Sequence, residues 1–366
     1  MWYNYFILYR IEVHSLKKVM VGMSGGVDSS TTAAILKDKG YEVCGVTLDL
    51  IGSGPNLAVE DAKKVADKLG IKHYVLSLKE EFAKNVIDYF ISEYQNGRTP
   101  NPCVECNKKI KFGKMLDFAI EKGCDFIATG HYVNSYYDEE KKRYVIKKSK
   151  AKKDQSYFLY GLTQFQLAHA MFPLGDYEKS YVRELAKKYD LPVAEKSESQ
   201  DICFINNISH ADFISNYTHT KPSSGIFVDS SGKNVGEHKG IINYTVGQRK
   251  GLGIALGEPS YILKIDSEKN EIVLGNKEMG LKKEIIAKNT NFILFDELKN
   301  EIKANVKIRY RATEVPCTII PFGKNAVKVV FKEGVYFPAP GQSVVFYSDN
   351  DLVIGGGIID NYNLVL

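Results

Sequence analysis

Short apolar runs and amphipathic stretches alternate through the first third of the chain. The apolar, β-rich runs predict strands at 20–23, 41–50, 72–78 and 125–129. The helical spacing of apolar positions elsewhere predicts helices at 30–39, 56–69, 80–94 and 108–122. Strands that alternate with helices in this way predict a parallel sheet covered on both faces.

The pattern changes in the second half of the chain. Residues 156–189 keep a helical pattern, but beyond Cys203 short β-branched segments are separated by glycine turns. From about Lys282 the strands are longer, with examples predicted at 304–312, 315–320, 326–331 and 343–347. We therefore predict an extension at 1–16, an α/β domain with a parallel sheet at 17–205, a small β-rich central domain at 206–280 and a C-terminal β-barrel at 281–366.

The composition is that of a globular protein with more than one core. The chain has 366 residues, of which 44% are hydrophobic and 25% charged, so two or three domains are expected. No apolar run reaches the roughly 18 residues that cross a bilayer, and the opening residues lack the flanks of a signal peptide. The six cysteines are irregularly spaced, unlike a secreted disulfide scaffold. We expect a cytoplasmic enzyme with reactive thiols and no membrane partner.

The stretch 20–30 has the features of a site for the phosphates of a nucleotide. Ser24, Gly25 and Gly26 follow an apolar strand, and Asp28 and Ser29 begin a helix. The two glycines let the backbone approach an anion, and the first helical amides point at it with the positive end of the helix dipole. The spacing and the lysine of the common P-loop are missing. A plain glycine turn is the alternative, but the serines and Asp28 favour a nucleotide.

A basic run occupies residues 141–153, which include eight lysines and arginines and no acidic residue. The formal net charge of +5 is modest for a nucleic-acid-binding protein, so binding of this kind would depend on local patches. A solvated hairpin explains the run equally well.

Two cysteines lie in a loop with two prolines that leads into a predicted helix. The loop reads Thr99-Pro100-Asn101-Pro102-Cys103-Val104-Glu105-Cys106-Asn107, and Asn107 is a candidate helix cap. A thiol beside a helix N-terminus, with lysines nearby, is expected to ionise more easily than a free thiol and could act as a nucleophile. Half of a zinc site is the alternative, but no second pair of ligands has zinc spacing. The remaining cysteines apart from Cys203 lie in apolar surroundings and are interpreted as packing residues: Cys44, Cys124 and Cys317.

Several motifs, in order, closely resemble those of the tRNA-specific 2-thiouridylases, which belong to the PP-loop (N-type) ATP pyrophosphatases. The motifs lie at 22–29, 97–107, 128–132, 153–159, 202–205, 245–253, 309–311 and 340–342. The resemblance runs from about Lys17 to the end of the chain. It implies a tRNA sulfurtransferase that cleaves ATP between its α and β phosphates, attaches AMP to C2 of the wobble uridine through oxygen, and replaces that oxygen with sulfur.

The resemblance also assigns residues to the site. The nucleotide site falls on Gly22, Met23, Ser24, Gly25, Gly26, Val27, Asp28, Ser29, Leu48 and Gly130. The nucleophilic cysteine matches Cys106, and the cysteine that carries a persulfide matches Cys203. The positions that contact the target base in the family correspond to Asn101, Pro102 and Cys103. Further tRNA-contacting positions correspond to His131, Lys153, Asp154, Gln155, Arg309, Tyr310 and Gln342. A structural role explains His131 equally well.

Two positions depart from the family pattern, in which aspartate is expected at 103 and methionine is frequent at 48. Leu48 should be nearly neutral, because Leu and Met fill similar volumes. Cys103 adds a third thiol, so Cys103, Cys106 and Cys203 could hold a [4Fe-4S] cluster with one iron open to sulfide. The alternative, which we favour, is that Cys103 only lines the loop.

The family chemistry implies further partners. It needs ATP with Mg²⁺, a tRNA anticodon loop whose uridine can leave its stack, and a sulfur donor protein, either a cysteine desulfurase or a sulfur relay protein. It ends with a Cys106–Cys203 disulfide that an outside reductant reopens. A PP-loop ligase or amidotransferase acting on a small metabolite is the alternative enzyme, although no glutaminase domain is visible. A noncatalytic RNA-binding protein is a third hypothesis.

Overall fold

The computed structural model describes residues 16–51, 57–197, 202–205, 208–254 and 258–360, so nearly all of the predicted extension lies outside it. Five parallel strands form the N-terminal sheet in the order β3-β2-β1-β4-β7. Their bounds are β1 (Lys18–Gly22), β2 (Glu42–Asp49), β3 (Lys72–Ser77), β4 (Phe126–Ala128) and β7 (Ala170–Met171). The predicted parallel sheet is confirmed, and its first strand lies in the middle.

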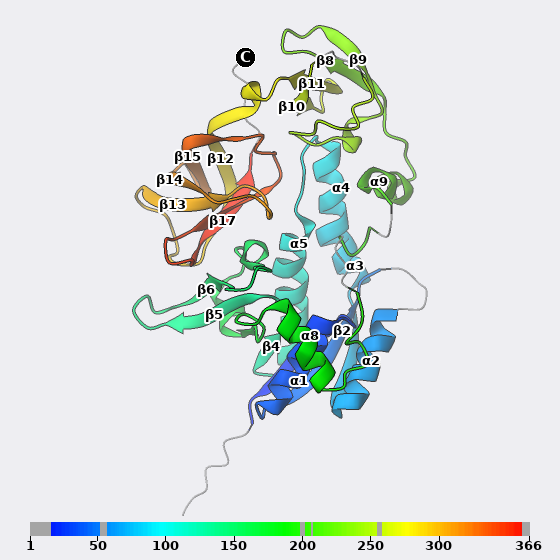
Figure 1. Cartoon of the computed structure of the whole chain (residues 1–366), viewed down its shortest axis with the longest axis vertical. Helices are drawn as coiled ribbons and strands as arrows, with labels where there is room; N and C mark the ends of the chain where they lie inside the picture. The colour runs from blue at the N-terminus through cyan, green and yellow to red at the C-terminus, as the bar shows by residue number, and fades with distance from the viewer. Residues whose placement is uncertain (1–15, 52–56, 198–201, 206–207, 255–257, 361–366) are drawn as a thin grey trace, which may run out of the picture.

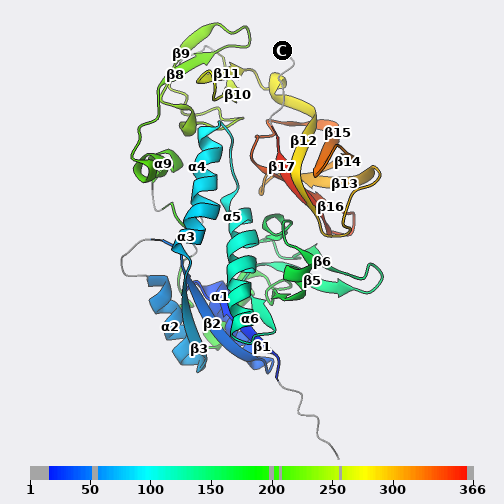
Figure 2. The same cartoon turned by 180° about the vertical axis from the view of Figure 1, so that it is seen from behind.

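Alternate residues of β1 supply two hydrophobic cores, one on each face of the sheet. Val19 and Val21 pack in one core, whereas Met20 packs in the other. The first core is covered by α1 (Val27–Asp38), α2 (Leu57–Leu69) and α8 (Lys179–Lys188), and the second by α6 (Met115–Glu121). Figure 1 labels α1, α2 and α8 beside the strands, and Figure 2 labels α6 in the view from behind. Burial of both faces explains why β1 is a continuous apolar run.

Two helical rods connect the sheet to the rest of the molecule, and each contains a π-helical segment. The first consists of α3 (Lys79–Phe82), the π-helix η1 (Ala83–Ile87) and α4 (Asp88–Gln95). The second consists of α5 (Pro102–Glu105), the π-helix η2 (Cys106–Lys114) and α6. The two rods run from the sheet toward the β-rich domains (Figure 2). The helix predicted at 108–122 therefore begins earlier, at Pro102.

The region predicted as helical at 156–189 is more varied than its pattern indicates. It contains the 3-10 helix η3 (Ser156–Phe158), α7 (Gln164–Ala168), the short strand β7 and then α8. A capping box starts α7, in which the Thr163 side chain accepts from the Gln166 amide and the Gln166 side chain accepts from the Thr163 amide. The helical prediction is wrong here because hydrogen bonding to β4 makes 170–171 a strand. Before this region, β5 (Val133–Asp138) and β6 (Arg143–Lys148) form a hairpin that carries much of the basic run.

The remaining chain forms a central sheet and a closed barrel. After α9 (His210–Thr218), the central sheet has the order β10-β11-β8-β9, with β8 (Gly225–Val228), β9 (Asn234–His238), β10 (Tyr261–Asp266) and β11 (Glu271–Gly275). Two 3-10 helices lie in this part, η4 (Ile241–Asn243) and η5 (Glu278–Gly280). The barrel is closed by β12 (Leu281–Phe292), β13 (Ile302–Lys307), β14 (Val315–Pro321), β15 (Ala326–Tyr336), β16 (Ser343–Tyr347) and β17 (Val353–Ile359). The predicted fold class, with its C-terminal barrel, is confirmed.

The barrel is hydrogen bonded to the α/β domain. The Thr99 amide donates to the Pro340 carbonyl at 2.7 Å. The Asn291 side-chain amide donates to the Tyr160 and Leu162 carbonyls at 2.7 and 3.1 Å. In the described part of the chain, no helix is long and apolar enough to cross a membrane.

Candidate functional site

The predicted phosphate cradle is the loop between β1 and α1. The Met23 amide donates to the Val46 carbonyl at 2.8 Å, and the Thr47 hydroxyl donates to the Met23 carbonyl at 2.8 Å, so β2 fixes the start of the loop. Gly25 has a φ of +66°, and a Cβ there would lie 2.7 Å from the Ala58 carbonyl oxygen. Only glycine fits this position.

The N-terminus of α1 is uncapped by any side chain, because its N-cap is Gly26. The neighbouring hydroxyls bond within the loop instead. The Ser29 Oγ accepts from the Ser24 amide at 3.1 Å, and the Ser30 Oγ donates to the Gly26 carbonyl at 2.9 Å. A twelve-residue helix with free first amides, behind a rigid glycine loop, favours an anion at this end.

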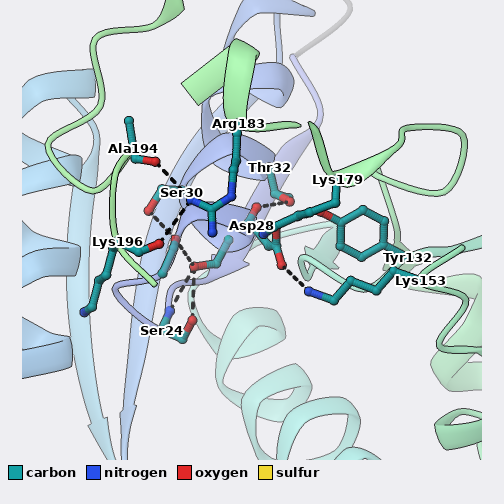
Figure 3. Close-up of polar contacts among 12 residues, drawn as sticks. Ser24, Asp28, Ser30, Thr32, Tyr132, Lys153, Lys179, Arg183, Ala194 and Lys196 are labelled. Carbon is teal, nitrogen blue, oxygen red and sulfur yellow. Dashed lines mark hydrogen bonds and ion pairs between the residues drawn. The ribbon is translucent and has the colours of Figure 1, made fainter. Parts of the chain in front are cut away.

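Asp28 is the carboxylate of the cradle, and three donors from other elements surround it (Figure 3). The Tyr132 hydroxyl donates to Oδ1 at 2.7 Å, and Lys153 Nζ lies 3.2 Å from Oδ2. Lys179, at the start of α8, donates to Oδ1 as well. Sequence reasoning missed Tyr132 and Lys179 as cradle residues, because only the fold brings them to Asp28.

A third lysine reaches the loop from the other side. Lys196 Nζ donates to the Gly25 carbonyl at 3.0 Å and to the Asp61 carboxylate at 2.7 Å. Arg183 holds this segment by donating to the carbonyls of Ala194 and Lys196 at 3.4 and 3.2 Å (Figure 3). The cradle is thus bordered by lysines that lie far from it in the sequence.

The two nucleotide-site residues predicted outside the loop lie near it as well. A Cβ at Gly130 would lie 2.9 Å from the Ser29 amide nitrogen and the Asp28 carbonyl carbon, so the chain after β4 touches the first turn of α1. Leu48, near the end of β2, packs against the second sheet core and the first rod. The remaining residues predicted from 22 to 29 form the loop and the first turn themselves.

The three predicted site cysteines come from two segments. Cys106 is buried and is the first residue of η2. Cys103 lies one turn earlier, in α5, and is exposed. Cys203 is exposed and lies in the segment 202–205. The buried Phe204 ring anchors this segment on the first rod, with ring centroids 5.7 Å from Phe82 and 5.3 Å from Phe90. The fold therefore brings Cys203 to the rods, about a hundred residues away in the sequence.

The thiols are less acidic than the sequence led us to expect. Burial raises the pKa of Cys106 to about 12, against the opposing charge of Lys111, and the nearby Cys203 and Cys103 thiols add to the rise. Cys103 and Cys203 reach the surface, but protein atoms surround most of each thiol, and this desolvation raises the pKa of both. The expectation of an easily ionised thiol is therefore wrong for the free protein, because desolvation of the thiolate exceeds the effect of the helix terminus and the lysines.

An iron–sulfur cluster is not supported by this arrangement. Within the described residues, no group of three His, Cys, Asp or Glu side chains is placed to hold a metal ion. Cys103, Cys106 and Cys203 lie close enough for their charges to interact, but they do not converge as ligands. We therefore derive no step from such a cluster.

The loop with the predicted base contacts is fixed by the barrel. Asn101 is the N-cap of α5 and Pro102 follows as its first residue, a position where proline is well tolerated. The Gln342 side-chain amide donates to the carbonyls of Thr99 and Pro100 at 3.0 and 3.3 Å. Asn107 is not the cap: it is buried within η2 and donates to the Phe158 carbonyl at 3.1 Å.

The other predicted tRNA contacts lie in two places. The Gln155 side chain accepts from the Tyr132 amide at 3.0 Å, and Asp154 accepts from the Ser149 amide at 3.0 Å, so the segment 153–155 is tied to the cradle side. The Tyr310 ring packs on Phe158, with centroids 4.5 Å apart. Arg309 donates to the Phe337 carbonyl at 2.6 Å and thereby holds the barrel to its own connecting segment.

His131 follows Gly130 at the cradle, and its ring packs near the helix η2 that begins at Cys106. Its Nδ1 is 2.8 Å from the Thr129 hydroxyl, and its ring packs near Phe112. Burial, and then the charges of Lys111 and Lys153, hold the pKa of His131 well below its usual value, so the ring is neutral at physiological pH. Lys153 pairs with Asp28 of the cradle, whereas the charge of Lys111 acts on the thiols. The pKa of His131 is therefore lowered by one lysine from each part of the site.

Three family models match the chain. They are the tRNA methyl transferase HUP domain at residues 17–207, the tRNA methyl transferase PRC-barrel domain at 211–276 and the aminomethyltransferase beta-barrel domain at 282–359. The chain is thus a three-domain protein with an N-terminal HUP domain, in keeping with its parallel sheet and closed barrel.

Curated relatives match almost the whole chain. A protein of Acetivibrio thermocellus is 50% identical over 94% of this chain and 99% of its own length. Proteins of Clostridioides difficile and Caldanaerobacter subterraneus are 49% and 51% identical, each over 94% of this chain and 98% of its own length. All three are named tRNA-specific 2-thiouridylase MnmA, with a numeral in the last case. The chain belongs to the tRNA-specific 2-thiouridylase family, and the resemblance of its motifs is confirmed.

Proposed function

We propose that this protein replaces the C2 oxygen of the wobble uridine of tRNA with sulfur, at the expense of ATP. The observation that carries the proposal is the presence, in one domain, of an uncapped anion cradle and a pair of cysteines from separate segments. The family membership supplies the substrate class. A metabolite ligase built on the same cradle would not need the two thiols.

ATP would lie with its phosphates at the amides of α1. The lysines that border the loop, Lys153, Lys179 and Lys196, would balance the charge of the pyrophosphate as it leaves. Mg²⁺ usually binds through one or two carboxylates together with phosphates and water, and Asp28, which accepts from Tyr132, Lys153 and Lys179, would supply a carboxylate for it. The ion would neutralise phosphate charge. The uridine C2 oxygen would attack the α-phosphorus, so that AMP becomes attached to that oxygen and pyrophosphate is released.

The uridine must leave its stack to reach the site, which a single-stranded anticodon loop permits. The loop at 99–103 would meet the base, because Gln342 and the N-cap position of Asn101 hold that loop rigid. The segment 153–155, Tyr310 and the basic hairpin β5–β6 would contact the tRNA around it. Binding should therefore weaken as salt rises.

Sulfur would arrive as a persulfide on Cys203, from a cysteine desulfurase or a sulfur relay protein. In one route, the terminal sulfur attacks C2 and AMP leaves; the Cys106 thiolate then attacks the Cys203 sulfur and frees the thiouridine. In the other, Cys106 attacks the persulfide first and releases hydrosulfide, which attacks C2. Both routes oxidise the two thiols to a Cys106–Cys203 disulfide and reduce the transferred sulfur, and an outside dithiol must restore the thiols.

A product assay tests the proposal. Purified protein, ATP, a sulfur source, a dithiol and unmodified tRNA should yield AMP, pyrophosphate and 2-thiouridine, detected by mass spectrometry of digested tRNA. Omission of tRNA should abolish AMP formation. AMP formed with a small metabolite in place of tRNA would favour the ligase hypothesis, and the absence of AMP under all conditions would contradict both enzyme hypotheses.

A further inference from the structure

Lys111 is a cation that no motif assignment includes, although its charge acts on every thiol of the site. It belongs to η2, the π-helix Cys106–Lys114 in the second rod. Figure 2 shows this rod, between the labels α5 and α6, running from the sheet toward the other domains. The same helix contains three other lysines, Lys108, Lys109 and Lys114.

The π-helical winding puts Lys111 on the same side of the helix as Cys106. In an α-helix, the neighbours on one face are three and four residues apart, so residue 111 would point away from residue 106. In a π-helix the backbone bonds join residues five apart, and residue 111 therefore follows residue 106 on one side of the helix. Single π-helical turns occur frequently at functional sites.

The surroundings of Lys111 differ from those of the other lysines. Lys109 pairs with Glu105 at 3.0 Å, and the Lys108 and Lys114 side chains are exposed. Lys111 is half-buried, and no carboxylate within the described residues forms an ion pair with it. Phe112, the next residue, is buried against His131 and Phe172, which fixes this part of the helix.

The charge of Lys111 reaches all members of the thiol cluster, by which we mean Cys103, Cys106 and Cys203. Burial is the largest cause that raises the pKa of each thiol, and Lys111 is in each case the largest charge that opposes it. Lys111 also contributes, after burial, to the low pKa of His131. The charge of Lys111 thus acts both on the segment that contains Cys103 and Cys106 and on the segment that contains Cys203.

We propose that Lys111 is the positioning cation of the thiol cluster, which holds the negatively charged sulfur during transfer: the persulfide anion on Cys203 and the Cys106 thiolate. This inference rests on the proposed function, since it names the residue that stabilises the sulfur anions of that reaction. Both sulfur routes pass through an anion at this place. A half-buried site without a nearby positive charge would disfavour that anion.

Two alkylating reagents measure the effect without tRNA. Iodoacetate is an anion, whereas iodoacetamide is neutral, so the ratio of their rates at Cys203 reports the local positive charge independently of how reactive the thiol is. A neighbouring charge near a protein surface contributes on the order of 1 kcal/mol after screening, so Lys111→Met should lower the ratio about fivefold. Lys111→Arg should keep it, and Lys108→Met, on the exposed side of the same helix, should leave it unchanged.

The second readout is the reaction itself. We expect Lys111→Met to lower kcat for thiolation about tenfold with little change in the KM for tRNA, and Lys111→Arg to restore most of the rate. Lys111→Gln provides a second uncharged variant in case the methionine variant folds poorly. An unchanged reagent ratio in the folded uncharged variants would overturn the inference. Failure of the proposed function gives a different result, because wild-type protein would then make no thiouridine while the reagent ratio still depended on Lys111.

Discussion

The cradle and the thiol cluster are built in opposite ways. The cradle is a contiguous loop whose glycines, serines and helix start create the site locally, and remote residues only complete it. The thiol cluster is assembled from segments about a hundred residues apart. The pKa of its buried thiol, Cys106, is set mainly by burial under the surrounding side chains. A local motif therefore predicts the chemistry of the cradle, whereas the chemistry of the thiols depends on the fold.

The largest expected effect concerns the thiol cluster. Cys106→Ser and Cys203→Ser should each lower thiolation by at least roughly 10³-fold, because a serine hydroxyl cannot replace the sulfur nucleophile or carry a persulfide. Thiouridine in digested tRNA, measured by mass spectrometry, checks this. Cys317→Ala, which changes a buried cysteine in the barrel, should keep most of the activity. Undiminished thiolation in either serine variant would contradict the account.

Cys103→Ser sharpens this prediction because it separates the loop-lining hypothesis from a sulfur role. We expect thiolation within about threefold of wild type, since an exposed side chain that only lines the loop tolerates this change. A loss as large as that of Cys106→Ser would show that the third thiol takes part in the chemistry.

The pH dependence tests whether burial controls the cluster. Because burial raises the pKa of Cys106 to about 12, its reactive thiolate is scarce at neutral pH and increases as pH rises. The rate at which iodoacetamide modifies Cys106 in the free protein should therefore increase about tenfold per pH unit between pH 7 and 10. A rate that levels off near pH 7 would mean that the helix terminus and lysines outweigh burial.

A methyl group at Gly130 tests the local construction of the cradle. Gly130→Ala places a Cβ 2.9 Å from the Ser29 amide nitrogen and should displace the first turn of α1. The strain should weaken ATP binding by roughly 1–3 kcal/mol, measured by calorimetry. Gly123→Ala is the control for a folding defect, because a Cβ there meets nothing within 4 Å and the φ of +71°, unlike the backbone at Gly130, adds strain away from the cradle. The same ATP affinity in Gly130→Ala and wild type would place ATP elsewhere.

The smallest effect concerns the link between the base loop and the barrel. Gln342→Ala removes the donor to the carbonyls of Thr99 and Pro100 and should lower the free energy of unfolding by about 1 kcal/mol. Chemical denaturation measures this change. Gln248→Ala, in the central domain, removes a comparable pair of bonds, with Thr245 and Lys250, that does not involve the base loop and should leave tRNA thiolation unchanged. If Gln342→Ala lost tRNA binding while its free energy of unfolding stayed that of the wild type, Gln342 would instead be a direct tRNA contact.

The same contrast explains how much could be predicted from the sequence. The alternation of strands and helices, the barrel and the loop at 22–29 were predicted correctly, because periodicity and glycine placement are local signals. Lys179 and Lys196 were missed, since nothing near them in the sequence indicates that α8 and the segment after it meet the cradle, and Tyr132 was missed although the neighbouring Gly130 was assigned to the nucleotide site. The acidity of Cys106 was predicted with the wrong sign, because burial is a tertiary property.

The central claim is that the uridine oxygen receives AMP at the cradle before the thiols supply sulfur. The most direct test is to label the C2 oxygen of the target uridine with ¹⁸O and to analyse the AMP released during one turnover. The account predicts one ¹⁸O atom in the phosphate of AMP for each thiouridine formed. Labelled oxygen in water, with unlabelled AMP, would contradict it.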